Sequence, residues 1–79
     1  MKITTFHDTF HARQRSVERN IALPVMMDVV KYPTARRQLR RGRYGGMMYR
    51  FTKQSADETI EVIAEVKKTE CWLLIAYRL

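Results

Sequence analysis

From Ala35 to the C-terminus the chain follows a two-residue period, and this period constrains the fold more than any other feature of the sequence. It is typical of β-strands, because successive side chains of a strand point to opposite faces of a sheet. Glycine-rich and polar stretches, typical of turns, separate the runs. The pattern predicts strands over residues 36–41, 47–52, 60–67 and 71–79, with a turn at 42–46. The last run, CWLLIAYRL, is apolar on both faces, which favours a central or covered strand.

Two helices are expected before the first strand. Thr9 is a good N-cap, because its hydroxyl can accept hydrogen bonds from the free amide protons of a first turn. The first helix is expected to run from residue 10 to residue 19 or 20, where Asn20 ends it. A second helix begins at Leu23, with Pro24 in its first turn, and Pro33 stops it. Its few polar residues predict that protein covers most of its circumference.

The order of these elements predicts the fold class. Seventy-nine residues suffice for one hydrophobic core, so residues 1–79 are expected to form a single domain. Helices followed by consecutive strands with short links predict an α+β fold. In this fold, two N-terminal helices pack on one face of a three- to four-stranded antiparallel sheet.

The chain has a net charge of +7, and its basic residues are concentrated in the middle. No acidic residue lies between Val29 and Ala56, whereas eight residues there are basic: Lys31, Arg36, Arg37, Arg40, Arg41, Arg43, Arg50 and Lys53. A one-signed run of this length predicts a surface for nucleic acid or for an acidic protein, with a solvated basic surface as the alternative. Arginine predominates, and its planar fork suits bidentate contacts with phosphate.

The single cysteine, Cys71, excludes an intramolecular disulfide and fits a reducing compartment, while its apolar neighbours predict a buried thiol. No apolar run approaches the length of a membrane span, and residues 1–8 lack the hydrophobic core of a secretory signal. The expected location is therefore the cytoplasm, of its own cell or of a host or target cell.

The segment HDTFH, residues 7–11, raises the question of a metal site because it is similar to the HExxH of zinc proteases. A zinc pair of that kind needs both histidines on one helical face, a glutamate as base and a third ligand. If Thr9 caps the helix, His7 lies outside it. Asp8 is one methylene shorter than glutamate, and the chain has no third histidine. The sequence therefore predicts no metal site.

A stripe of His11, Arg15 and Arg19, each four residues apart, permits phosphate chemistry instead. Metal-independent RNA cleavage requires proton transfer to and from oxygen, and stabilisation of charge on the phosphate. Histidine titrates near neutral pH and suits the transfer, and an arginine one turn away can hold the phosphate. From the spacing alone, the alternative to a catalytic role is that these side chains are surface or helix-capping groups.

Residues 9–21, TFHARQRSVERNI, resemble the [ST]-x-H-A-x-x-R-x-x-x-R-x-I opening of a family of small domains of unknown function. That family is grouped with RelE, ParE and BrnT-type toxins, in a wider fold class with barnase, EndoU and the colicin ribonucleases. The short second helix, basic strand, YRF-type strand and two apolar strands also follow the family's plan. Asn20 replaces the family's common glycine, and asparagine tolerates a left-handed helix end.

The resemblance implies a RelE-like fold and a toxin-type ribonuclease that cleaves mRNA or tRNA without a metal or cofactor. His11 and Arg15 match the motif as proton-transfer group and phosphate-stabilising cation, and Tyr77 lies where relatives often carry a functional tyrosine or threonine. The expected RNA-binding residues are Arg19, Arg36, Arg37, Arg40, Arg41, Arg43 and Arg50, with Tyr44 and Tyr49 as candidate stacking residues. The implied partners are RNA, free or on the ribosome, and an acidic antitoxin or immunity protein.

A non-enzymatic binder on the same scaffold is the alternative, since ParE-like relatives act on DNA gyrase without cleaving RNA. Such a protein would use its basic face to block a host protein or to occupy nucleic acid. Sequence-specific DNA binding through the helix over residues 10–20 is a weaker alternative. The helices lack a helix-turn-helix signature, and the arginines lie as much on strands as on helices.

Overall fold

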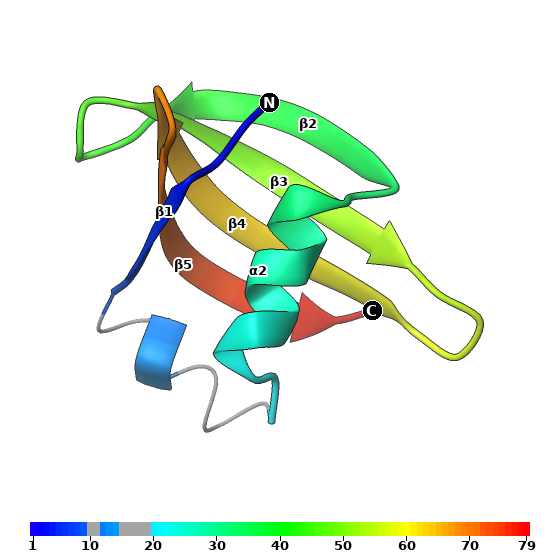
Figure 1. Ribbon diagram of the computed structural model, residues 1–79. Helices are drawn as coiled ribbons and strands as arrows, with labels where there is room; N and C mark the ends of the chain where they lie inside the picture. Colours follow the sequence, from blue (N-terminus) through cyan, green and yellow to red (C-terminus); the bar gives the residue numbers. More distant parts are fainter. Residues whose placement is uncertain (10–11, 15–19) are drawn as a thin grey trace.

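Five strands form one mixed sheet in the order β1-β5-β4-β3-β2, with helix α2 across one of its faces (Figure 1). The computed structural model describes residues 1–9, 12–14 and 20–79. The elements are β1 (Thr5–Asp8), α2 (Leu23–Lys31), β2 (Ala35–Arg41), β3 (Met47–Gln54), β4 (Thr59–Lys67) and β5 (Glu70–Arg78). Neighbouring strands from β2 to β5 are antiparallel, and β1 runs parallel to β5.

The predicted architecture, two helices on a three- to four-stranded antiparallel sheet of RelE type, is wrong. A fifth strand, β1, makes the sheet mixed, and it pairs with β5 over the register from Thr5–Glu70 to Asp8–Leu73. Four residues are too few for an alternating pattern to be visible in the sequence, and the partner strand lies at the opposite end of the chain. The helical content is also smaller than expected: α2 has nine residues, and of the first helix the structure describes residues 12–14.

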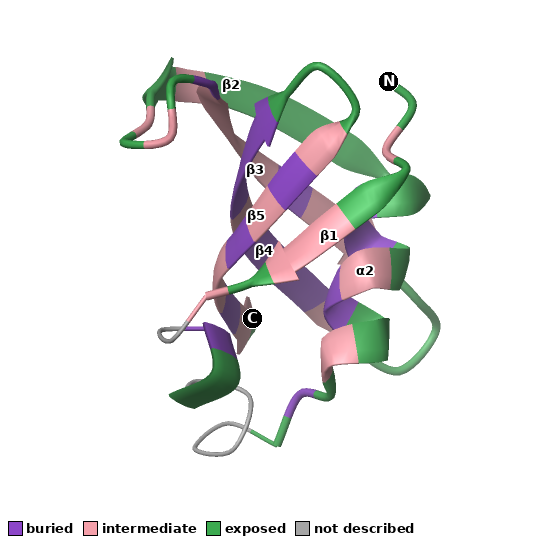
Figure 2. Cartoon of the chain, turned by 60° about the vertical axis from the view of Figure 1, so that its left-hand side comes forward, coloured by how far each residue is buried: buried purple, intermediate pink, exposed green. Residues whose placement is uncertain are grey.

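Several local predictions are confirmed. Helix α2 begins at Leu23 with Pro24 in its first turn, and it ends at Lys31, before Pro33. The turn between β2 and β3 lies at residues 42–46, and β5 is an interior strand between β1 and β4. The prediction that protein covers most of α2 is wrong. Its outer side is exposed to solvent, including Val25 at 39%, and Figure 2 shows that the buried residues lie on the side toward the sheet.

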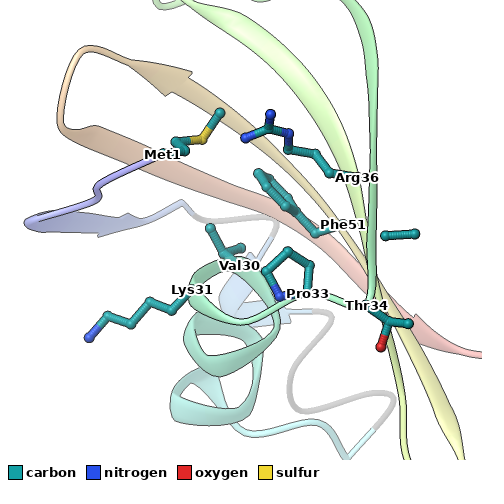
Figure 3. A pocket seen from close by; sticks show the side chains of 8 residues that line it. Met1, Val30, Lys31, Pro33, Thr34, Arg36 and Phe51 are labelled. Carbon is teal, nitrogen blue, oxygen red and sulfur yellow. The ribbon is translucent and has the colours of Figure 1, made fainter.

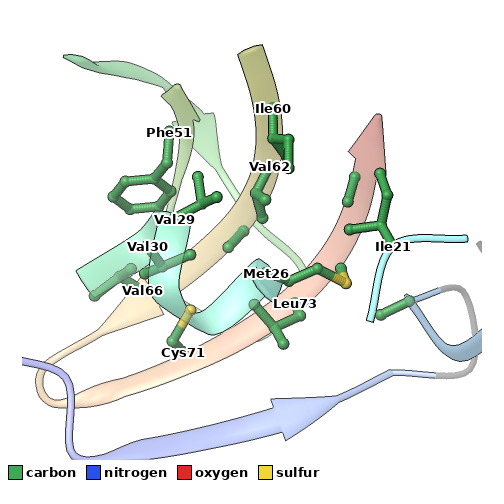
Figure 4. Packing of buried hydrophobic residues seen from close by; sticks show 13 residues of the cluster. Ile21, Met26, Val29, Val30, Phe51, Ile60, Val62, Val66, Cys71 and Leu73 are labelled. Carbon is green, nitrogen blue, oxygen red and sulfur yellow. The ribbon is translucent and has the colours of Figure 1, made fainter. Parts of the chain in front are cut away.

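The core lies between α2 and the sheet (Figure 4). Met26 and Val29 of α2 pack with buried side chains of the three interior strands, among them Phe51, Val62 and Leu73. Cys71 is also fully buried there, and burial raises the pKa of its thiol to about 12. The prediction of a buried, structural cysteine is therefore confirmed.

Thr9 joins the first helical turn to the sheet. Its hydroxyl accepts a hydrogen bond from the Ala12 amide at 3.1 Å and donates one to the Leu73 carbonyl at 2.7 Å. Its own carbonyl accepts from the Arg13 amide at 3.0 Å, so Thr9 is the predicted N-cap. Asn20 has a left-handed φ of 54°, which asparagine tolerates better than most residues.

We expect Thr9→Val to lower the free energy of unfolding by about 1–2 kcal/mol, because the isosteric side chain loses both the cap and the bond to β5. Thr9→Ser keeps the hydroxyl and should restore most of the loss. Urea denaturation would measure both variants, with Thr4→Ala as an exposed control. An unchanged stability of Thr9→Val would show that this double contact contributes nothing.

Candidate nucleic-acid interface

The face of the sheet opposite α2 is not covered by any element that the structure describes, and we call it the open face. Cross-strand pairing places Phe51, Val62 and Ala76 in one row toward the core, and the alternate residues face the other way. The row Arg50, Ile63 and Ile75 thus lies on the open face, and all three side chains are half-buried. A sheet face left this way can receive a ligand.

An apolar groove of 410 Å³ runs along the open face. Its lining residues are Leu39, Arg40, Met48, Ile63, Leu74 and Ile75. A shift in the register between β4 and β5 produces part of this groove. Ile63 pairs with Ile75 and the next residue, Ala64, pairs with Leu73, so Leu74 is an extra residue in β5. Such a bulge re-aims side chains, and Leu74 and Ile75 both line the groove.

A polar cluster of Glu61, Tyr77 and Arg50 lies beside this groove. The Tyr77 hydroxyl donates a hydrogen bond to Glu61 Oε1 at 2.9 Å. Arg50 Nε lies 2.9 Å from the same oxygen, an ion pair in which the N–H is not aligned for a hydrogen bond. Glu61 is only 7% exposed, whereas the Arg50 side chain is 40% exposed. A carboxylate, a phenol and a guanidinium on one face are groups that can transfer protons and bind phosphate.

A second buried carboxylate, Glu65, anchors the turn at residues 42–46. Its Oε2 accepts hydrogen bonds from the amides of Tyr44 at 2.9 Å and Gly46 at 2.7 Å. Its Oε1 lies so close to Gly42 that a Cβ there would meet it at 1.8 Å, so residue 42 must be glycine for this packing. Glu65 therefore fixes the turn against β4.

An aromatic column extends from this turn across the sheet. Tyr44 stacks on Trp72 with ring centroids 4.9 Å apart, and Trp72 stacks on His7 of β1 at 4.8 Å. His7 Nε2 lies 2.9 Å from Glu70 Oε1. The column ties the basic turn to the far edge of the sheet, and its rings are half-buried.

The structure separates the predicted basic residues instead of gathering them on one surface. On β2, Arg37 pairs with Arg50 of the open face, and Arg40 lines the groove. Arg36 and Arg41 pair with Phe51 and Met47, on the α2 face. Arg43 lies in the turn, 5.9 Å from the Tyr44 ring.

Arg36 lies beside a separate cavity of 370 Å³ on the α2 face (Figure 3). Val30, Pro33 and Phe51 form its apolar walls, and Met1 lies across from Arg36. The Arg36 guanidinium is 5.4 Å from the Tyr49 ring, which packs against the core. Tyr49 and Arg36 therefore cannot share a ligand surface with the groove.

The remaining predicted site residues have different outcomes. Tyr77 lies on the open face, whereas His11, Arg15 and Arg19 lie outside the described residues. His7 is in β1 and so is not part of the first helix, as Thr9 predicted. Within the described ranges, no three His, Cys, Asp or Glu side chains converge on a possible metal site.

Sequence reasoning missed Glu61, Glu65 and Trp72. A signal for the two glutamates exists, because they alternate with Ile60, Val62 and Ala64 and thus lie on one face of β4. What each one contacts depends on the register with β3 and β5, which the sequence does not display.

Comparisons with protein-family models, curated proteins and solved structures find no match for this chain. In the part of the chain that the structure describes, no helix is both long and apolar enough to cross a membrane.

We expect Glu65→Ala to lower the free energy of unfolding by about 2–3 kcal/mol, because two amides of the turn lose a charged acceptor. Glu70→Ala, which removes only the half-exposed partner of His7, should cost less than about 1 kcal/mol. Urea titration followed by the fluorescence of Trp72, the only tryptophan, would compare them. Equal losses would mean that Glu65 does not anchor the turn.

Proposed function

We propose that this protein binds single-stranded RNA across the open face. The observation that carries the proposal is the position of Arg37 and Arg40 on the open face, where Arg40 lines an uncovered apolar groove. Neither arginine has a carboxylate partner among the described residues. Phosphate contacts supply most of the affinity of such surfaces, and an apolar groove suits the faces of unpaired bases.

The shape of the open face favours a single strand over a duplex. The net charge of +7 attracts any polyanion, so charge alone does not distinguish RNA from DNA. The open face, however, offers no helix to enter a major groove, and its apolar lining would contact bases only if they were unstacked. RNA loops and single strands present bases in this way.

Metal-independent cleavage of the bound RNA is the second part of the proposal. Glu61 would accept the proton of the 2′-hydroxyl while the 2′-oxygen attacks phosphorus, and Arg50 would stabilise the negative charge on the phosphate. The 5′-oxygen would leave with a proton from a second group, and a 2′,3′-cyclic phosphate would form. Tyr77 and His11 are the candidates for that acid, Tyr77 from its contact with Glu61 and His11 from the resemblance.

Arg37→Gln and Arg36→Gln make the same charge change on opposite faces of β2. We expect Arg37→Gln to weaken RNA binding and to reduce the slope of log affinity against log salt by about 0.7. Arg36→Gln should leave both unchanged. Fluorescence anisotropy with a labelled single-stranded RNA would measure this, and equal effects of the two variants would place the RNA elsewhere.

We expect Glu61→Gln to lower the rate of RNA cleavage in EDTA about 100-fold or more while leaving RNA affinity nearly unchanged, because the amide keeps the shape of the side chain but cannot accept the proton. Tyr77→Phe and His11→Ala, assayed beside it, would identify the acid. Gel analysis of end-labelled RNA is the measurement. If wild-type protein binds RNA but cleaves none, the protein is a non-enzymatic binder, and the cleavage mechanism fails while the interface stands.

A further inference from the structure

Strand β2 is an open edge of the sheet. It has seven residues and pairs with β3 on one side, and no strand of the described residues lies on its other side. Figure 2 shows it exposed along most of its length, and Leu39 is its only residue that is not exposed. The other edge strand, β1, has only four residues. Long open edges are templates for pairing with an added strand, so β2 is the edge at which one would be received.

The charges of β2 are not neutralised within the part of the molecule that the structure describes. Its four arginines, Arg36, Arg37, Arg40 and Arg41, make no ion pair there. Five carboxylates have side-chain partners elsewhere: Asp8 pairs with Arg13, Asp28 with Lys53, Glu58 with Arg78 and Glu61 with Arg50, and Glu70 contacts the His7 ring. These five carboxylates are thus engaged away from this edge.

The arginines lie on both faces of β2, which RNA binding at the open face does not explain. Arg37 and Arg40 are on the side of the groove, whereas Arg36 and Arg41 are on the side of α2. A strand added beside β2 also presents side chains alternately to both faces. It would bring acidic residues next to both pairs of arginines.

We propose that β2 receives an extended acidic segment of a partner protein as a sixth strand of the sheet. Backbone hydrogen bonds at the open edge would provide part of the affinity, and glutamate or aspartate side chains beside the four arginines would provide selectivity. A second copy of this chain is excluded as the occupant through its own β2, because like charges directly opposite each other destabilise a strand pair.

The same contact regulates RNA binding, and this part rests on the proposed function. Arg37 and Arg40 cannot hold phosphates while acidic side chains of a sixth strand lie beside them. Of the two proposed ligands, Arg36 and Arg41 would contact only the added strand and not the RNA, so substitutions there separate peptide binding from RNA binding.

The test is a titration with a peptide of repeating Glu-Glu-Thr-Thr, which as a strand carries glutamates on both faces, followed by amide proton–nitrogen NMR spectra and hydrogen exchange. We expect saturable binding and new exchange protection at alternate amides of β2. The double variant Arg36→Gln/Arg41→Gln should weaken peptide binding about tenfold, because two charge pairs with the peptide are lost. The same variant should bind RNA normally.

A polyglutamate peptide of equal charge is the matched control, because glutamate has low strand propensity. It should bind more weakly and give no protection of β2 amides. The proposal is overturned if polyglutamate binds as well as the Glu-Glu-Thr-Thr peptide, if no β2 amide becomes protected, or if the double variant binds the Glu-Glu-Thr-Thr peptide normally. The RNA interface is tested separately by RNA binding, which Arg37→Gln should weaken and Arg36→Gln/Arg41→Gln should leave unchanged.

Discussion

The contact between α2 and one face of the sheet is the interaction on which the rest of the structure depends. A nine-residue helix is marginal by itself in water, so α2 is stable because Met26, Val29 and Val30 are buried against the strands. Burial of each such side chain contributes roughly 1.5–3 kcal/mol. The same contact removes Phe51, Val62 and Leu73 from water, and it thereby decides which face of β3, β4 and β5 is the core face.

Choosing one core face leaves the alternate residues on the other. There the chain combines half-buried apolar side chains with two buried carboxylates, and each carboxylate has donors close by. Burying an unpaired carboxylate would be costly, so Glu61 and Glu65 require the contacts that Tyr77, Arg50 and the turn at 42–46 provide. These contacts also hold Arg50 and Tyr77 on the open face, beside the groove. Stability and the proposed interface therefore use the same residues.

Much of the local structure could be predicted from the sequence, because it depends on neighbours along the chain. The Thr9 cap, the limits of α2 at Pro24 and Pro33, and the four strands from β2 to β5 all follow from capping chemistry and period-two alternation. The overall architecture could not be predicted, because β1 is four residues long and its partner β5 lies more than sixty residues away. Its hydrogen bonds become favourable only when the remaining sheet is already in place.

The candidate site shows the same division. By itself the sequence determined the basic character of the middle of the chain, the absence of acids there, and that Tyr77 and Arg50 belong to strands. Only the tertiary structure decided that Arg36 and Arg37 face opposite sides, that Leu74 is an extra residue beside the groove, and that Glu61 meets both Tyr77 and Arg50. Composition and the two-residue period depend only on single residues and their near neighbours along the chain. A contact between strands depends instead on their register, and the packing of the whole sheet against α2 sets that register.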